Sequence, residues 1–263
     1  MSRSSLKNVF RLVEQANKEL PVEKSFLEDL KRCIELDNIK DKREPTRSYK
    51  PSSLRCIRNM YYQIVGEAPD ASPVSYSLIG IWNSGSAIHE WLQTAISRMA
   101  DNGMDCEYID VGEYVKSRGL KHLEVVGQCG METKLYHKDL NMRFLCDGVL
   151  RYKNKYYILE IKSEVSYRWM SREGVEPAHY DQGTAYSLSL DIPDVIFVYV
   201  NRDVLDMKSF LFTPTGEMKQ DLIGKITECD GYVNRLICPP KPDDIDKRTC
   251  SYCEYKQACR ADR

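Results

Sequence analysis

Two carboxylates and a lysine stand near the middle of the chain, where they could bind a metal ion together. Asp147 belongs to one apolar stretch, and Glu160-Ile161-Lys162 closes the next one. Because successive side chains of a strand alternate between its faces, we expect Glu160 and Lys162 on one face and Ile161 on the other. Carboxylate oxygens suit Mg²⁺ or Mn²⁺, and a neighbouring lysine suits the handling of a phosphodiester and of an attacking water.

The elements that would position these residues are a β-hairpin followed by a crossover. Residues 143–152 and 156–162 are rich in β-branched and aromatic side chains around a polar turn at 153–155, which is typical of a hairpin. Residues 195–200 are a near-continuous apolar run, typical of a buried strand. With a helix predicted over 177–190, these segments predict a right-handed βαβ unit.

Two helices carry polar residues that could reach the same site. Residues 79–99 have an amphipathic pattern and contain His89, although a histidine in such a helix is more often a satisfied polar residue than a ligand. In helix 177–190, Gln182 and Tyr186 are four residues apart and therefore lie on one face. Taken alone, such a pair is more often a polar helix face with a half-buried tyrosine.

The rest of the chain predicts mainly helices. Pro21 separates two helices within residues 1–40. A helix that begins at Pro51-Ser52-Ser53 would place Cys56 in its first turns. Further elements are predicted over residues 123–136 (one or two strands), 208–212 (a strand) and 216–236 (a helix).

The composition is that of an ordinary globular protein: of 263 residues, 42% are hydrophobic and 29% are charged. No apolar run approaches the length of about eighteen residues that a membrane span needs, and no apolar signal core follows the first residues, so we expect a cytoplasmic, intracellular protein. The net charge of −1 does not by itself predict a nucleic-acid partner. Seven basic against two acidic residues between Lys40 and Arg58 fit a phosphate-contacting patch and a solvated surface segment equally well.

Ten cysteines are many for a chain expected inside the cell, where disulfide frameworks are rare. Cys250, Cys253 and Cys259 fall within ten residues, which indicates a metal or iron–sulfur site. The scattered cysteines are interpreted as packing residues, the usual state of a free cysteine. They are Cys33, Cys106, Cys129, Cys146, Cys229 and Cys238.

The order of these residues resembles that of a nuclease family. Asp147 and Glu160-Ile161-Lys162, after a strand, a turn and a strand, resemble the PD-(D/E)xK nuclease core, with Cys146 where the family name has a proline. The flanking residues resemble the RecB-like exonuclease branch, and within it the iron–sulfur members: the CRISPR-associated RecB-like exonucleases and the AddB nuclease domain. These flanking residues are Cys56 and His89 upstream, and Gln182, Tyr186, Cys250, Cys253 and Cys259 downstream.

The resemblance implies a role for each residue of the hairpin. Asp147, Glu160, the backbone carbonyl of Ile161 and the imidazole of His89 would hold Mg²⁺ or Mn²⁺. Lys162 would orient or help to deprotonate the attacking water and would stabilise charge on the phosphoryl oxygens.

The resemblance also implies roles outside the hairpin. Gln182 and Tyr186 would position the DNA backbone or the attacking water. Four cysteines would hold a 4Fe–4S cluster that fastens the end of the chain to an early helix, although Cys-x-x-Cys spacing alone leaves structural Zn²⁺ as an alternative. They are Cys56, Cys250, Cys253 and Cys259.

The implied fold class is α/β, with a restriction-endonuclease-like core: a mixed central sheet flanked by helices, N-terminal helices and a C-terminal cysteine-cluster tail. Residues 1–50 are expected to be a helical extension. Residues 51–263 are expected to be the RecB-like nuclease domain, closed by the four cysteines.

The implied function is a metal-dependent DNA exonuclease that hydrolyses phosphodiester bonds at single-stranded or duplex DNA ends. Two alternatives remain open: a structure-specific endonuclease on the same core, and a non-catalytic DNA-binding subunit. The resemblance is compatible with a helicase, recombination or CRISPR-adaptation partner, with a homo-oligomer, and with a bacterial, archaeal or phage origin.

Overall fold

The computed structural model of the protein describes residues 21–40, 47–70, 74–243, 245, 247–251 and 253–262. These residues form two compact units, one holding residues up to 40 together with 74–81, the other holding the remainder. The domain boundary expected at residue 50 stays a prediction. The helix expected before Pro21 lies outside the described residues, as does part of the basic stretch that follows Lys40.

The smaller unit contains helix α2 (Val22–Lys40) and the first turns of helix α4 (Tyr76–Ser97). The expected second helix of the N-terminal region is thereby confirmed. The Glu35 carboxylate accepts a hydrogen bond from the backbone N–H of Tyr76 at 3.0 Å, which ties the start of α4 to α2. The ammonium of Lys31 lies 5.3 Å from the centre of the Tyr76 ring, a cation–π contact that supports the same junction.

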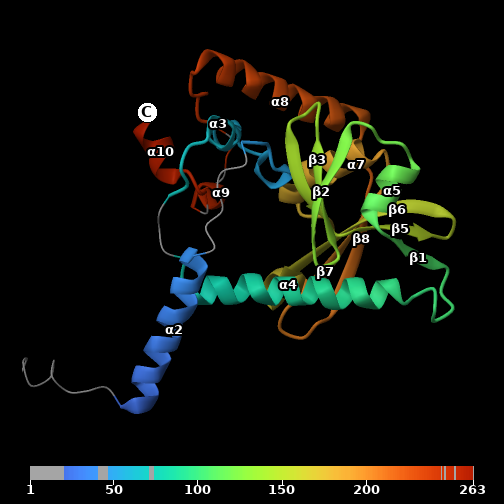
Figure 1. Ribbon diagram of the computed structural model, residues 1–263, viewed down its shortest axis with the longest axis horizontal. Helices are drawn as coiled ribbons and strands as arrows, with labels where there is room; N and C mark the ends of the chain where they lie inside the picture. Colours follow the sequence, from blue (N-terminus) through green and yellow to red (C-terminus); the bar gives the residue numbers. More distant parts are fainter. Residues whose placement is uncertain are drawn as a thin grey trace, which may run out of the picture. The chain divides into compact units, whose positions relative to one another are not determined.

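The larger unit is built on a mixed five-stranded sheet with the strand order β1-β5-β6-β7-β8 (Figure 1). The pair β6–β7 is parallel, whereas the other neighbouring pairs are antiparallel. Helix α7 connects β6 to β7, which confirms the predicted βαβ unit and the α/β fold class. The bounds are β1 (Cys106–Ile109), β5 (Gly148–Tyr152), β6 (Lys155–Glu164), β7 (Val195–Asn201), β8 (Met207–Phe212) and α7 (Tyr180–Leu190).

A second, three-stranded antiparallel sheet has the order β2-β3-β4, with β2 at Leu123–Cys129, β3 at Glu132–His137 and β4 at Met142–Cys146. The prediction of one strand over 143–152 is therefore wrong, because the chain leaves this sheet at Cys146 and enters the five-stranded sheet at Gly148. The physical reason is Asp147, whose backbone carbonyl accepts hydrogen bonds from the side chains of Gln93 and Tyr108 rather than from a neighbouring strand.

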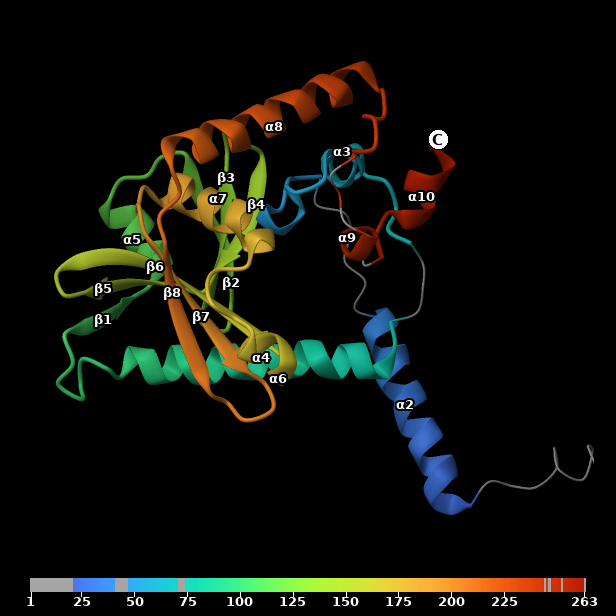
Figure 2. The same ribbon diagram turned by 180° about the vertical axis from the view of Figure 1, so that it is seen from behind.

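Apolar side chains cover both faces of the five-stranded sheet. On one face, Ile88 and Leu92 of α4 pack with Leu159, Ile161 and Val200. On the other face, the three-stranded sheet and helices α3 (Ile57–Val65), α7 and α8 (Gly216–Arg235) form a larger core. Figure 2 shows α4 and α8 on opposite sides of the sheet. Strand β6 therefore has an apolar side that faces α4 and a side that carries Glu160 and Lys162.

The segment around Cys56 differs from its prediction. Pro51–Ser53 is a short 3₁₀ turn, and helix α3 begins only at Ile57 and ends at Val65. Cys56 is the residue before the first turn of α3, in an extended conformation with φ −130° and ψ 112°. Ser53 does not cap a helix, because the cap positions are occupied by Lys50 and Cys56. Its hydroxyl instead lies 2.7 Å from the Lys50 carbonyl oxygen and 3.0 Å from Gln63 Oε1.

The remaining helices are short except for one. Sequence patterns did not predict α5, which is capped by Asp110: the Asp110 carboxylate accepts a hydrogen bond from the Glu113 N–H. Within the described part of the chain, no helix is both long and apolar enough to cross a membrane. The bounds are α5 (Val111–Ser117), α6 (Ser166–Met170), α8 (Gly216–Arg235), α9 (Lys247–Ser251), α10 (Lys256–Ala261) and the 3₁₀ turn Pro177–His179.

Gly148, which directly follows Asp147, is required by close packing. A Cβ atom added there would lie 2.5 Å from a ring carbon of Tyr108, whose hydroxyl bonds the Asp147 carbonyl. We predict that Gly148→Ala lowers the free energy of unfolding by about 1–3 kcal/mol, because the ring must shift. Urea unfolding measures this change.

The matched control is Gly224→Ala in α8, where an added Cβ meets nothing within 4 Å. Replacing an exposed helical glycine by alanine should raise stability by up to about 1 kcal/mol. Equal effects of the two substitutions would contradict the packing argument.

Candidate active site and cysteine centre

Asp147 is held rigidly at the junction of the two sheets. Its backbone carbonyl accepts hydrogen bonds from Gln93 Nε2 and from the Tyr108 hydroxyl, each at 2.7 Å. Its Oδ2 accepts the backbone N–H of Ile161 at 2.6 Å. The residue is only 4% exposed. These bonds turn the second carboxylate oxygen, Oδ1, toward His89 of α4.

His89, Glu132 and Asp147 form a compact group of potential metal ligands. His89 Nδ1 lies 3.2 Å from Asp147 Oδ1 and 3.3 Å from Glu132 Oε1, and one ligand atom of each residue lies within 4.8 Å of the others. Among the His, Cys, Asp and Glu side chains of the described residues, this is the group of three or more whose ligand atoms all lie within 4.8 Å of one another. An imidazole and two carboxylates are a donor set that Mg²⁺ and especially Mn²⁺ accept.

Glu132 was not predicted from the sequence. The register of β3 and β4 pairs Thr133 with Cys146, so the next pair outward brings Glu132 opposite Asp147. A hairpin prediction over 132–146, centred on the polar residues 139–141, would have found it. The sequence interpretation instead placed the hairpin partner of Asp147 on the other side, in β6.

Electrostatics bind this group together. Burial alone would lower the pKa of His89, but its hydrogen bonds to Asp147 and Glu132 raise it to about 10. The imidazole therefore carries a proton at neutral pH in the metal-free protein and offsets the charge of two carboxylates. A cation that binds there replaces this proton, as expected of a histidine ligand.

Glu160 and Lys162 share one face of β6, as predicted, and form an ion pair with Lys162 Nζ 2.5 Å from Glu160 Oε1. Lys162 Nζ also donates to Gln182 Oε1 at 2.8 Å, and Gln182 Nε2 donates to the Tyr186 hydroxyl at 2.7 Å. The Tyr186 hydroxyl donates onward to the Leu145 carbonyl at 2.7 Å. Because this hydroxyl uses its only proton there, it must accept from the Gln182 amide, which turns the amide oxygen toward Lys162.

Glu160 is almost completely buried, and its pKa is raised to about 7. Burial is the main cause, the charge of Lys162 opposes the rise, and the charge of Asp147 adds to it. Tyr186 is 3% exposed, and burial raises its pKa far above its ordinary value, so its hydroxyl stays protonated. Tyr186 thus orients Gln182, and Gln182 in turn holds Lys162.

The structure joins the predicted hairpin and helix residues into one site. His89, Asp147, Glu160, Lys162, Gln182 and Tyr186 are linked by the contacts described above. Ile161 takes part through its N–H, which bonds Asp147; the role of its carbonyl as a ligand stays a prediction.

The four predicted cysteine ligands do not form a group with the spacing found for His89, Glu132 and Asp147 among the described residues. N–H groups nevertheless point at the sulfurs of two of them. Arg58 Nη1 donates to Cys259 Sγ at 3.3 Å, and Asn59 Nδ2 donates to Cys253 Sγ at 3.6 Å. The backbone N–H of Tyr255 lies 3.4 Å from the same Cys253 sulfur. N–H donors of this kind stabilise thiolates that bind a metal or cluster.

The thiols also influence one another. Burial raises the pKa of Cys56, the N–H groups of Asn59 and Arg58 lower it, and the charges of Cys259 and Cys250 raise it further. Burial likewise raises the pKa of Cys253, with Cys56 and Cys259 adding to the rise. These interactions place Cys56 and Cys253 within electrostatic range of each other or of the other two predicted ligands.

Arg58 of α3 fastens the end of the chain beside this centre. Its guanidinium donates to the carbonyls of Pro239, Cys259 and Asp262 at 2.8 to 2.9 Å. The Tyr62 hydroxyl donates to the Asp262 carboxylate at 2.8 Å. The predicted attachment of the C-terminal tail to the early helix agrees with these contacts.

No protein-family model matches the chain, and no curated protein matches it. Among solved structures, the chain is similar to SSO0001, with a TM-score of 0.45 and 15% identity over 92% of this chain and 98% of that chain. It is also similar to an alkaline exonuclease (LHK-Exo) from Laribacter hongkongensis, with a TM-score of 0.41 and 10% identity over 73% of this chain and 92% of that chain. The complex of LHK-Exo with dAMP gives a TM-score of 0.41 and 9% identity over 72% and 91%.

Proposed function

We propose that this protein is a metal-dependent deoxyribonuclease of the PD-(D/E)xK type that hydrolyses phosphodiester bonds at single-stranded or duplex DNA ends. The observation that carries the proposal is the convergence of His89, Glu132 and Asp147 within 4.8 Å, beside a lysine held by Glu160 and Gln182. Such a combination of acidic ligands, imidazole and ammonium suits an anionic phosphodiester.

The side chains divide the chemistry between two neighbouring clusters. Bound Mg²⁺ or Mn²⁺ would neutralise the scissile phosphate and lower the pKa of a water molecule. Asp147 faces both clusters, since one of its oxygens lies near His89 and the other bonds the strand that carries Glu160. Lys162 would leave its ion pair to contact the phosphoryl oxygens, and the carboxylate of Glu160 would then be free to act as a further metal ligand.

The cysteine centre is proposed to hold a 4Fe–4S cluster on Cys56, Cys250, Cys253 and Cys259. The N–H groups directed at three of these sulfurs support a thiolate centre. Structural Zn²⁺ remains the alternative. In either case the centre would fasten the C-terminal tail to α3, and metal binding would contribute to folding free energy.

We predict that Lys162→Ala lowers the rate of DNA cleavage by a factor of about 10² or more, because the ammonium that would contact the phosphoryl oxygens is lost. End-labelled single-stranded and duplex DNA is incubated with Mg²⁺ or Mn²⁺ and followed on denaturing gels. The matched control is Lys155→Ala, an exposed lysine at the far end of the same strand, which should keep full activity. Unchanged cleavage by Lys162→Ala would refute the proposed site.

Linear DNA that is degraded while plasmid circles stay intact would identify an exonuclease rather than the alternative endonuclease.

We predict that Glu132→Gln weakens Mn²⁺ binding by about tenfold or more, because a carboxylate ligand is lost. The control Glu107→Gln removes an exposed carboxylate paired with Arg151 and should leave affinity unchanged. Calorimetric titration measures both proteins.

The same titration tests the proton on His89. The pKa of His89 is raised to about 10, so below this pH each bound cation must displace a proton. Mn²⁺ affinity should therefore rise between pH 6.5 and 9, by up to about tenfold per pH unit. Calorimetry in two buffers of different ionisation enthalpy should detect the released proton. Affinity independent of pH would contradict this assignment.

We predict that protein purified without oxygen is brown and contains iron and acid-labile sulfide, and that Cys253→Ser loses both. Cys33→Ser, which removes an exposed cysteine of α2, should retain them. Colourless protein that contains zinc and is active would establish the zinc alternative instead.

A further inference from the structure

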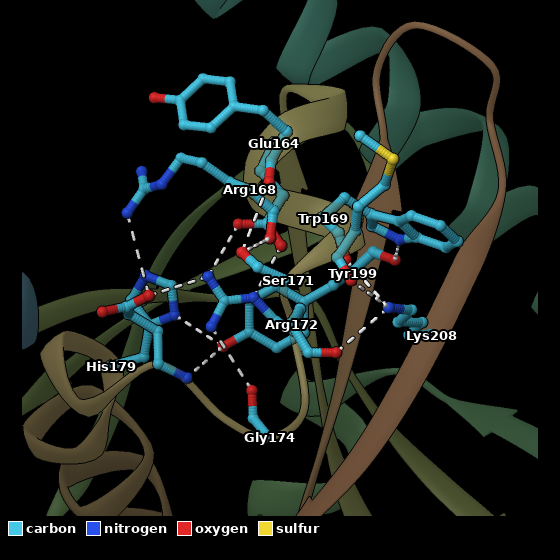
Figure 3. Close-up of polar contacts among 12 residues, drawn as sticks. Glu164, Arg168, Trp169, Ser171, Arg172, Gly174, His179, Tyr199 and Lys208 are labelled. Carbon is cyan, nitrogen blue, oxygen red and sulfur yellow. Dashed lines mark hydrogen bonds and ion pairs between the residues drawn. The ribbon is translucent and has the colours of Figure 1, made fainter.

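A cavity of about 670 Å³ lies beside Lys162 and has no role in the site described above. One wall comes from the end of β6 and from Tyr199 of β7. A second wall comes from the segment 168–179, and Arg55 and Thr249, each next to a cysteine of the cysteine centre, complete the lining. Figure 3 shows the polar contacts that build the second wall.

Arg172 is a fixed part of this wall. Its Nε and Nη2 contact the two carboxylate oxygens of Glu164 at 2.7 and 2.9 Å, and Nη2 also contacts Glu176 at 2.8 Å. Its guanidinium lies 4.6 Å from the centre of the Tyr199 ring. Arg172 therefore engages both carboxylates, and the three groups together carry a formal charge of −1.

Other contacts make the wall rigid. Lys208 of β8 donates to the carbonyls of Trp169 and Arg172, at 2.9 and 3.1 Å, at the end of α6. The Tyr199 hydroxyl accepts the backbone N–H of Glu176 at 3.0 Å and lies 2.9 Å from His179 Nδ1 (Figure 3). The wall therefore does not need a ligand in order to form.

The cavity is electropositive. Four cationic side chains line it, against the two carboxylates that Arg172 engages. Burial lowers the pKa of His179 to about 3, and the charges of Lys162, Arg172 and Arg168 contribute to this shift, so this imidazole is neutral. The four cationic residues are Arg55, Lys162, Arg168 and Arg172.

Arg168 is placed differently from Arg172. Its contact with Glu176 is an ion pair at 3.8 Å, longer than a hydrogen bond, and the same carboxylate oxygen already accepts from Arg172 at 2.8 Å. The Arg168 side chain is 29% exposed. Its planar guanidinium can thus turn to an incoming anion and bind two of its oxygens at once, as arginine does with phosphate.

We propose that this cavity binds a backbone phosphate of a single nucleic-acid strand, adjacent to the scissile phosphate, with Arg168 as the direct contact. The adjacency follows from Lys162, which belongs both to the cavity lining and to the proposed catalytic cluster. The inference rests on the proposed function for this adjacency. The binding of a strand phosphate by Arg168 can be tested without cleavage.

The test measures binding of a fluorescently labelled oligothymidylate to the full chain by anisotropy, in EDTA and over a range of salt concentrations. Arg168→Gln should weaken binding by about tenfold at low salt and should reduce the slope of log K against log salt by about 0.7, the value for one lost phosphate contact to a single strand. The matched control is Arg151→Gln. It removes an exposed arginine of β5 that pairs with Glu107, and it should change neither the affinity nor the salt slope. Equal binding and equal slopes for wild type and Arg168→Gln would overturn the proposal.

Two further measurements separate the outcomes. If wild type cleaves DNA but Arg168→Gln binds the strand normally, this inference fails and the proposed function stands. If no cleavage occurs but Arg168→Gln loses strand binding, the proposed function fails and the phosphate contact stands. Calorimetry with inorganic phosphate tests whether the cavity binds a free phosphate ion instead of a strand phosphate. If Arg168→Gln loses binding of inorganic phosphate but binds the strand as wild type does, the cavity is a site for a free anion and the proposal is overturned.

Discussion

The structure depends on the way in which Asp147 is held between two sheets. Side chains of α4 and β1 bond its carbonyl, and the backbone of β6 bonds one of its carboxylate oxygens. The chain can therefore change sheets at this residue without leaving its polar groups unpaired, which would be costly at 4% exposure. The other carboxylate oxygen, Oδ1, is thereby directed toward His89, and it forms the ligand group together with His89 and Glu132.

The site concentrates charge that an ordinary core would exclude. Glu160 and Asp147 are buried, and an isolated buried carboxylate is strongly unfavourable. The cost is limited because each negative group has a cationic or N–H partner: Lys162 for Glu160, protonated His89 and the Ile161 N–H for Asp147. Groups held in this way would exchange these partners for the proposed cation and phosphate, whereas apolar side chains could bind neither.

Local patterns predicted much of this arrangement. Alternation along β6 correctly placed Glu160 and Lys162 together, and the four-residue spacing correctly placed Gln182 beside Tyr186, because both depend only on the geometry of one element. The strand break at Asp147 and the position of Glu132 close to Asp147 both depend on which strands pair. Strand pairing is non-local, so the spacing of residues in the sequence does not reveal it. Strand β1 was missed for a similar reason: its four residues acquire their conformation by pairing with β5.

The position of Arg58 in the chain has a consequence for folding during synthesis. Its carbonyl partners lie 181, 201 and 204 residues later, so this buried guanidinium has none of them until residues 239–262 are made. Contacts of such long range form late, because the entropy of closing the loop opposes them. The sheets, whose strands end at Phe212, can pair before the tail exists. The order of synthesis thus leaves the surface of α3 that contacts residues 239–262 uncovered longest, and exposed surface of this kind favours aggregation of the nascent chain.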